Sequence, residues 1–187
     1  MIKRYIFACL VASSLSACSV SLSKAPEDYT GPDAAKIRAK NYLSTLALEV
    51  YEKSGDCYKK VDSRSLGPGF NIAGIKSTFN KRLPDMLPPS EELKDRDALE
   101  YRIKANQRLR VTLTKETFRN QSTTEYTTYK YDFIPKEGHD YDLYPLNSGY
   151  GVGVFDLTTQ KAAPDTWDGD KECEFEKSWF TGGKNYK

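Results

Sequence analysis

The sequence predicts a mainly all-β fold, a β-sandwich of antiparallel strands with one excursion that contains a short helix. Short segments of alternating apolar and polar residues recur along the chain, and turns rich in Gly, Pro and Asn separate them. Aromatic residues make up 12% of the chain, whereas disordered chains are poor in them, so we expect a folded core. Residues 33–187 are long enough to form it as one domain.

The first predicted strands lie near the start of this domain. Apolar and basic residues alternate over residues 35–40, which is the period of a strand with one buried face. The alternation returns over residues 46–50 and ends at Ser54-Gly55-Asp56, whose residue types are typical of a turn. We therefore expect two short strands here.

Later strands follow at similar spacing. Residues 99–103 and 109–113 alternate in the same way, and residues 105–107 predict a turn that joins them as a hairpin. Further strands are predicted at residues 123–134, 141–143 and 152–155. Within the first of these, Tyr129, Tyr131 and Phe133 share one face, as residues two apart in a strand do.

An excursion over residues 81–97 interrupts the strand pattern. Pro84, Pro88 and Pro89 oppose regular structure in its first half. Ser90 follows two prolines and precedes two glutamates, which predicts the start of a short helix. Such an insertion either carries a binding site or covers a sheet edge.

The first eighteen residues predict an export signal. Lys3 and Arg4 form a short basic segment, an apolar stretch covers residues 5–12, and mostly small residues follow up to Cys18. This layout is typical of a secretory signal peptide. The apolar stretch is well short of the roughly 18 residues that predict a membrane-spanning helix.

Leu15-Ser16-Ala17-Cys18 matches the lipobox of bacterial lipoproteins. The match predicts cleavage between Ala17 and Cys18, a diacylglycerol group on the Cys18 sulfur, and a further acyl chain such as palmitate on the new α-amine. Two or more acyl chains anchor a protein stably, whereas one binds a membrane only marginally. The alternative is an ordinary signal peptide with a chance cysteine at the cleavage site. In lipoproteins an Asp after the cysteine retains the protein in the inner membrane, so Ser19 favours the outer membrane.

The chain therefore divides into a signal peptide at residues 1–17, a lipidated Cys with a flexible tether at 18–32, and the β-sandwich domain at 33–187. Cleavage removes two of the 28 basic residues and none of the 26 acidic ones, so the mature chain has a formal net charge of zero. A neutral chain argues against general nucleic-acid binding and against electrostatic adhesion to anionic lipid. We therefore expect the protein to associate with the membrane through its covalently attached lipid.

Cys57 and Cys173 are the two cysteines left after Cys9 is discarded and Cys18 is lipidated. Export places them in an oxidising compartment, where an even count predicts a disulfide. A metal pair or a catalytic thiol is the alternative. A zinc site needs more ligands, and the chain has one histidine.

Several polar residues are weighed as catalytic or metal-binding groups. His139 follows a glycine and is interpreted as an exposed turn residue. Asp140 and Asp142 would share one strand face and could form a glycosidase pair, but a solvated face is the simpler interpretation. A weak candidate for a Ca²⁺ site, in a loop that lacks the full ligand pattern, consists of Asp165, Asp168 and Asp170. We expect no catalytic residues and no cofactor besides the lipid. The two tryptophans, Trp167 and Trp179, could stack on a glycan but are more typical of a core.

The segment Gly31-Pro32-Asp33-Ala34-Ala35-Lys36-Ile37-Arg38, the late connection over residues 133–141 and the placement of Cys57 and Cys173 are similar to small, largely uncharacterised bacterial envelope lipoproteins. The resemblance implies a single β-sandwich domain and an envelope location. That group often has a cysteine in the late strand, where this chain has Gly149 to Gly153, so the bridging pattern of the group is not carried over.

These observations predict a lipid-anchored, non-enzymatic module that binds or assembles an envelope protein or glycan. The anchor, the tether, the neutral surface and the lack of a catalytic constellation all favour it. A cell-envelope hydrolase acting on peptidoglycan or another glycan is one alternative. A structural lipoprotein or an inhibitor of a lytic enzyme is another.

Overall fold

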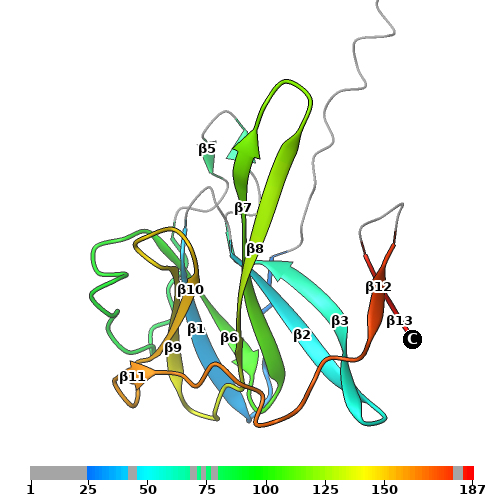
Figure 1. Cartoon of the computed structure of the whole chain (residues 1–187). Helices are drawn as coiled ribbons and strands as arrows, with labels where there is room; N and C mark the ends of the chain where they lie inside the picture. The colour runs from blue at the N-terminus through cyan, green and yellow to red at the C-terminus, as the bar shows by residue number, and fades with distance from the viewer. Residues whose placement is uncertain (1–24, 42–45, 68–70, 73–74, 77–79, 179–182) are drawn as a thin grey trace, which may run out of the picture.

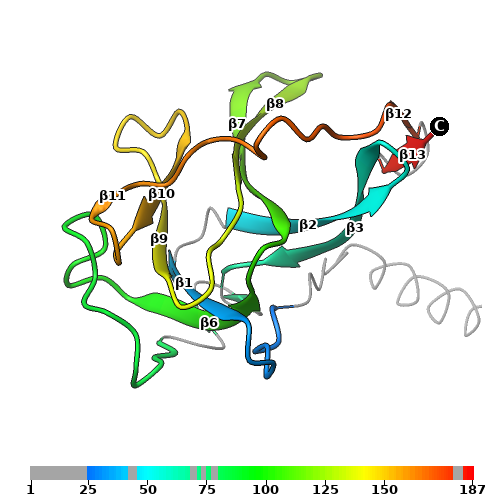
Figure 2. The same ribbon diagram turned by 90° about the horizontal axis from the view of Figure 1, so that it is seen from below.

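A computed structural model describes residues 25–41, 46–67, 71–72, 75–76, 80–178 and 183–187. Two β-sheets pack face to face (Figure 1), and the described residues contain strands and turns but no helix. The predicted β-sandwich is therefore confirmed. Figure 2, viewed from below, shows β1 and β6 in one layer and β2 and β3 in the other.

The first sheet has five strands in the order β11-β10-β9-β1-β6. Its strands are β1 (Ala34–Lys40), β6 (Ala98–Lys104), β9 (Asp140–Pro145), β10 (Val152–Asp156) and β11 (Lys161–Ala162). The pairing of β1 with β9 is parallel, and the other pairings are antiparallel.

The second sheet has four antiparallel strands in the order β3-β2-β7-β8. They are β2 (Leu46–Ser54), β3 (Cys57–Ser65), β7 (Arg108–Arg119) and β8 (Thr124–Phe133). Two small hairpins stand apart from both sheets: β4 (Asn71–Ile72) with β5 (Ile75–Lys76), and β12 (Phe175–Lys177) with β13 (Lys184–Tyr186).

The core lies between the two sheets and follows the alternation of the sequence. Ile37 and Leu143 enter it from the first sheet, and Val111 and Phe133 enter it from the second; all four are fully buried. Tyr129 and Tyr131 pack against the same core from the face that they share with Phe133. Burial of this apolar surface, at roughly 25 cal/mol per Å², is the main force that holds the sheets together.

The predicted hairpin between residues 99–103 and 109–113 is wrong, although both segments are strands. β6 pairs with β1, whereas β7 pairs with β2 and β8. The turn at Asn106, whose φ is +59°, therefore carries the chain from one sheet to the other. Both strands direct apolar residues to one core from opposite sides, and an alternating pattern is the same for either arrangement.

The predicted short helix after Ser90 is also wrong. We call residues 80–97 the covering loop. From Ser90 onward its backbone forms two successive turns: the Leu93 N–H donates to Ser90 O, and the Arg96 N–H donates to Leu93 O. Within the second turn Asp95 has a φ of +56°, which is not helical. The Ser90 hydroxyl makes no hydrogen bond among the described residues, so it does not cap a helix.

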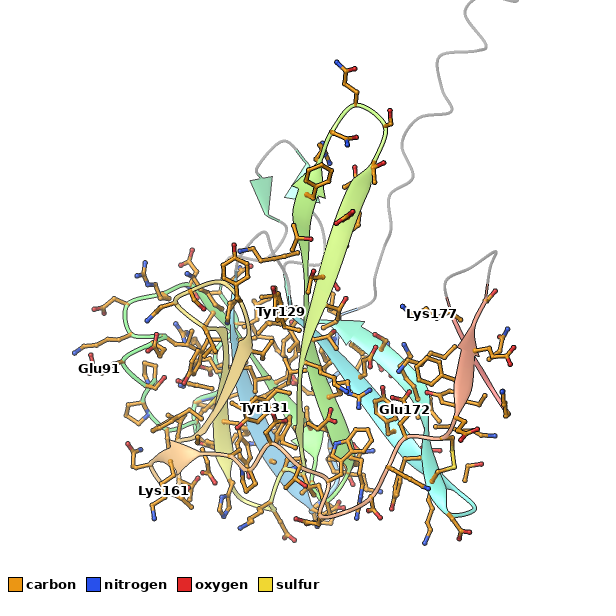
Figure 3. The ribbon with its side chains drawn as sticks, viewed as in Figure 1. Glu91, Tyr129, Tyr131, Lys161, Glu172 and Lys177 are labelled. Carbon is orange, nitrogen blue, oxygen red and sulfur yellow. A yellow bond between two sulfur atoms is a disulfide. The ribbon has the colours of Figure 1, made fainter. Side chains whose placement is uncertain are left out.

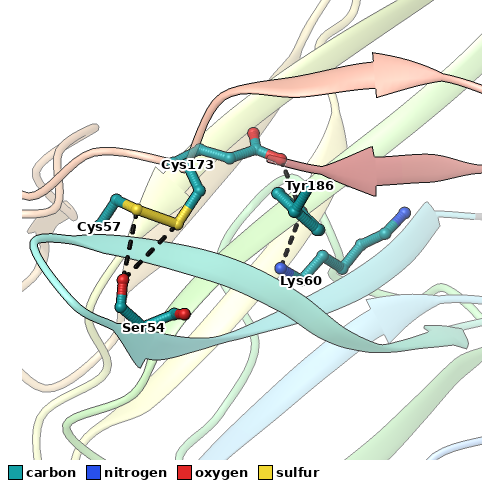
Figure 4. Close-up of a disulfide and its surroundings, with 6 residues drawn as sticks. Ser54, Cys57, Lys60, Cys173 and Tyr186 are labelled. Atoms are coloured by element: carbon teal, nitrogen blue, oxygen red, sulfur yellow. Dashed lines mark hydrogen bonds between the residues drawn. A yellow bond between two sulfur atoms is a disulfide. The ribbon is translucent and has the colours of Figure 1, made fainter.

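A disulfide joins Cys57 at the start of β3 to Cys173, which precedes β12, and the predicted bridge is confirmed. Figure 4 shows both sulfurs facing the carbonyl oxygen of Ser54, at 3.4 and 3.9 Å. Beside the bridge, the Tyr58 N–H donates to Lys171 O, and the Cys173 N–H donates to Tyr58 O. The bridge therefore fixes the C-terminal part of the chain to the edge of β3.

We expect the double substitution Cys57→Ser and Cys173→Ser to lower the free energy of unfolding by about 2–5 kcal/mol, because the bridge closes a loop of more than a hundred residues. Urea denaturation of the two proteins measures the difference. Thiol labelling of the denatured, unreduced wild-type protein is the control, and reactive thiols at Cys57 and Cys173 would contradict the bridge.

Candidate functional site

Asp140 and Asp142 do share one face of β9, as the sequence predicts, but that face is not solvated. Their side chains are 2% and 0% exposed, because the covering loop lies over them. The interpretation as a solvated strand face is therefore wrong. An open pair of carboxylates suited to glycoside hydrolysis is not formed either.

Strand register explains the charge that surrounds them. Arg38 of β1 lies directly opposite Glu100 of β6 on one side and Asp142 of β9 on the other. Its Nε donates to Glu100 Oε1 at 2.7 Å, and its Nη1 donates to Asp142 Oδ1 at 2.8 Å. Two residues earlier on the same two strands, Lys36 lies opposite Asp140, with Lys36 Nζ 3.2 Å from Asp140 Oδ1.

The three carboxylates also hold the covering loop in place through its backbone. Glu100 Oε2 accepts from the Leu83 N–H at 2.5 Å. Asp140 Oδ2 accepts from Leu87 and Asp142 Oδ2 from Ser90, each at 2.7 Å. Arg38 Nη2 in turn donates to Leu87 O at 2.6 Å. The excursion therefore covers the outer face of the first sheet. Through Lys81 it also pairs with the outer edge of β6, which is the edge-covering role considered for it.

Ionisation of Glu100 is favoured by these contacts. Burial raises its pKa, but the hydrogen bonds from the Leu83 N–H, Arg82 and Arg38 outweigh burial and bring the pKa below its ordinary value of 4.5. The folded protein therefore prefers the charged form, which is the form that binds the loop.

His139 is not the exposed turn residue that the sequence suggested. Its ring is 21% exposed and stacks on Tyr141 with the ring centroids 6.2 Å apart. Nδ1 lies 2.9 Å from Asp156 Oδ2. Burial raises the pKa of Asp156, but the hydrogen bonds from His139 and the Thr159 N–H outweigh burial. The pKa of Asp156 therefore lies below its ordinary value.

The weak Ca²⁺ candidate is not assembled. Asp165 Oδ1 accepts from the Asp132 N–H, and Asp170 forms an ion pair with Arg108, so their oxygens are directed to different partners. Asp168 sits at a turn with a φ of +55°. No group of three His, Cys, Asp or Glu residues in the described part of the chain could hold a metal ion.

Trp167 is buried, as the core interpretation predicts, but it lies on the outer face of the second sheet. Its Nε1 donates to Leu109 O at 2.9 Å, and its ring contacts Tyr51. Beneath it, Arg110 donates to both carboxylate oxygens of Asp132 and to Glu172 at 2.6 Å. The segment from residue 163 to residue 178, which we call the C-terminal cover, thus holds this face much as the covering loop holds the other.

A groove of about 630 Å³ opens where the covering loop meets the ends of the strands, and we call it the loop-edge groove. Its walls combine three cations, two carboxylates, a tyrosine and apolar side chains. The lining residues are Lys40, Glu91, Glu92, Arg96, Leu113, Lys115, Tyr144, Pro145, Leu146, Asn147 and Gly149. Figure 3 shows Glu91 on the covering loop, at the outer side of the sandwich.

Two glycines shape this groove. Gly153 lies opposite Tyr144 across β9 and β10, and a Cβ there would come within 2.6 Å of the Tyr144 ring. Gly149 has a φ of +71°, and a Cβ there would lie 2.6 Å from Lys115 Nζ. The glycines therefore allow Tyr144 to lie over the sheet and Lys115 to approach the turn closely.

The cations come from separate parts of the chain. Lys40 ends β1, Lys115 belongs to β7 and Arg96 belongs to the covering loop. Lys115 Nζ also lies 5.2 Å from the centre of the Tyr150 ring. No local motif joins these residues, so the sequence reasoning missed them. The Gly149–Gly153 run was the nearest signal.

Chemically, the loop-edge groove suits a polar ligand with carboxylate groups. The three cations of the groove outnumber its two carboxylates, which favours an anion. Tyr144 offers a flat surface for a sugar ring or a peptide side chain. Burial, together with the negative charges of Glu92 and Asp142, raises the pKa of Tyr144, so its hydroxyl remains a donor at neutral pH.

Three predicted sites lie outside the described residues: Ala17, Cys18 and Trp179. Cys57 and Cys173 are joined as predicted. In the described ranges, no helix has the length and apolar character required to span a membrane.

We expect the stability of the fold to fall on acidification. Because the pKa of Glu100 is lowered by folding, its contribution is present above 4.5 and is lost as the pH falls through the folded-state value. Glu100→Gln should lower the free energy of unfolding by about 3 kcal/mol at neutral pH. The variant should then lose less of this free energy on acidification than the wild-type protein does, which urea denaturation between pH 7 and pH 3 measures. Glu91→Gln, on an exposed glutamate of the same loop, is the matched control. Equal acid sensitivity in the Glu100→Gln protein would contradict this assignment.

Comparison with known proteins adds no assignment to this geometry. No family model matches the chain, and no curated protein and no solved structure matches it. The contacts of the described residues are therefore the basis for a functional proposal, and the loop-edge groove is the site they offer.

Proposed function

We propose that this chain is a lipid-anchored protein of the bacterial envelope and that its anchor lies in the outer membrane. In this proposal it acts without catalysis, as a binding or assembly module for an envelope protein or glycan. The loop-edge groove binds a carboxylate-bearing part of that partner. The observation that carries the proposal is the convergence of Lys40, Arg96 and Lys115 on one groove beside Tyr144.

The state of the acidic residues supports binding rather than catalysis. Asp140 and Asp142 are engaged with the covering loop, Lys36 and Arg38, so neither is available to a substrate. The single histidine of the chain is paired with Asp156. A general acid or base needs a reactive group within hydrogen-bond reach of the substrate, and these contacts remove the candidates that the sequence suggested.

The construction of the groove supports its role as a site. One wall is fixed by the carboxylates under the covering loop, and the opposite wall is the turn after β9. Side chains held on a rigid frame lose little entropy when a ligand binds. Arg96 has an exposed side chain with no described partner, so it is available to a ligand.

The membrane part of the proposal comes from the lipobox and the sequence that follows it. Cys18 supplies the anchor, and the residues between it and the domain supply a spacer. The spacer meets the domain at Asp28 and Tyr29, where the Asp28 carboxylate accepts from the Arg102 N–H and the Tyr29 N–H donates to Arg102 O. The domain is thus held close to the base of its tether.

We expect Cys18→Ala to leave an unprocessed or soluble precursor, because the acylated thiol is the anchor. Membrane fractionation and the intact mass of the purified protein measure this. Cys9→Ala is a suitable control, since it removes a cysteine of the signal peptide without touching the lipobox or the disulfide. Unchanged fractionation of the Cys18→Ala protein with a normal mature mass would refute the lipid anchor.

The groove is tested with a photo-crosslinking amino acid at Asn147 in intact cells. We expect a crosslinked partner from Asn147 and none from the same probe at Val61, an exposed residue of β3. Arg96→Ala should weaken the crosslink about tenfold, the loss of one charge-assisted contact, whereas Arg119→Ala, on an exposed arginine of the β7–β8 hairpin, should not. A crosslink that is insensitive to Arg96→Ala and Lys115→Ala would exclude the groove. Cleavage of isolated peptidoglycan by the purified protein would exclude the non-enzymatic role.

A further inference from the structure

The outer strands of the two sheets differ in how far other segments of the chain cover their free edges. The outer edge of β6 is covered along most of its length. The Lys81 N–H donates to Ala98 O, and Lys81 O accepts from the Glu100 N–H. Further along, Asp28 and Tyr29 bond to the backbone of Arg102. A sheet edge covered in this way offers no free backbone to another chain.

The first half of the outer edge of β3, up to Lys60, and the end of the first sheet are also protected. Residues 171–173 pair with Tyr58, and the hydroxyl of Tyr186 accepts from the Lys60 N–H. Figure 4 shows Tyr186 beside Lys60 and close to the disulfide. At the other end of the molecule β11 has two residues and Pro164 follows soon after it. Short edge strands of this kind resist pairing.

β8 is different. The C-terminal cover protects it only at its end, where Asp165 accepts from the Asp132 N–H. From Thr124 to Lys130, no described residue outside the β7–β8 hairpin forms a backbone hydrogen bond with the strand. This part of the hairpin rises beyond the sandwich (Figure 1), and all of its residues except Tyr129 are exposed.

The direction of the free groups follows from strand geometry. Backbone N–H groups alternate in direction along a strand. The Asp132 N–H points away from β7, because it bonds to Asp165. The register shift in this hairpin places the extra residue, Thr117, on β7, so β8 alternates without interruption. The N–H groups of Tyr126, Thr128 and Lys130 therefore also point away from β7.

We infer that this open edge of β8 pairs with the same edge of a second copy of the chain. The two strands run antiparallel, with Thr127 opposite Thr127 of the second copy, and the two four-stranded sheets become one continuous sheet. This register is centred on the open segment Thr124–Lys130 and uses all of it. A centre one residue later would require Asp132, which Asp165 already occupies.

The side chains fit this pairing. Tyr126 faces Thr128 of the second copy, and aromatic and β-branched residues are favourable cross-strand neighbours. Glu125 faces a tyrosine and Lys130 faces a threonine, so no charge faces a like charge. The open segment also contains no proline and no bulge, two of the features that block an edge, and its one lysine, Lys130, lies at the end of the paired segment. A second copy is thus a complementary occupant for the whole segment.

Thr127→Cys in the full-length chain, produced in cells that export and process it, tests the register. Paired residues without mutual hydrogen bonds lie about 4.5 Å apart between Cα atoms, which a disulfide can span. We expect a disulfide-linked species of twice the chain mass on a non-reducing gel. Val61→Cys, on the exposed part of β3, should give no such species.

Thr128→Pro in the Thr127→Cys background removes a donor that the hairpin itself does not use. We expect at least an approximately tenfold loss of the linked species, because one backbone hydrogen bond is lost from each copy. An unchanged melting temperature shows that the fold is retained. A monomer from Thr127→Cys, or equal linkage from Val61→Cys, overturns the proposal. Linkage of Thr127→Cys to a different protein overturns the second copy in favour of a foreign strand. None of these outcomes depends on the ligand of the loop-edge groove.

Discussion

A guanidinium group buried between a sheet and the irregular segment that covers it is the constraint on which this structure depends. Arg38 holds this position on the first sheet and Arg110 on the second, with exposures of 2% and 7%. Each bonds to carboxylates from neighbouring strands and to the segment above it. Desolvation of buried ion pairs is costly, so their net stabilisation can be small. Their specificity is high, because the donors are satisfied in one arrangement of strands and cover.

The loop-edge groove is a consequence of this arrangement. Covering loops are usually the mobile parts of a β-sandwich, but here the backbone N–H groups of Leu83, Leu87 and Ser90 are bound to buried carboxylates. The groove wall that carries Glu91, Glu92 and Arg96 continues directly from these contacts. The buried carboxylates thus position the exposed charged side chains of the groove wall.

The sequence predicted the individual strands better than their partners. Alternation identified β1, β2 and β8, because each buries one face. It could not identify β3, whose residues Cys57–Ser65 are mostly polar, since the C-terminal cover and not the core packs on it. Nor could it pair β6, because apolar alternation does not record which sheet a strand joins. The buried state of Asp142 depends on Arg38, more than a hundred residues away, and on a covering loop that only the folded chain brings over it. The groove residues were missed because they come from separate strands and loops that lie together only in the folded chain.

The position of β1 in the first sheet determines the order in which the molecule can form. β1 begins the domain, yet its two neighbours are β6, centred some sixty residues later, and β9, about a hundred residues later. No sequence-local strand can pair with it, and closing such long loops before any contact is gained makes folding slow. The first sheet therefore assembles only when nearly the whole chain is present. In a chain built in this way, β1 has no native partner until β6 has been synthesised, some sixty residues later.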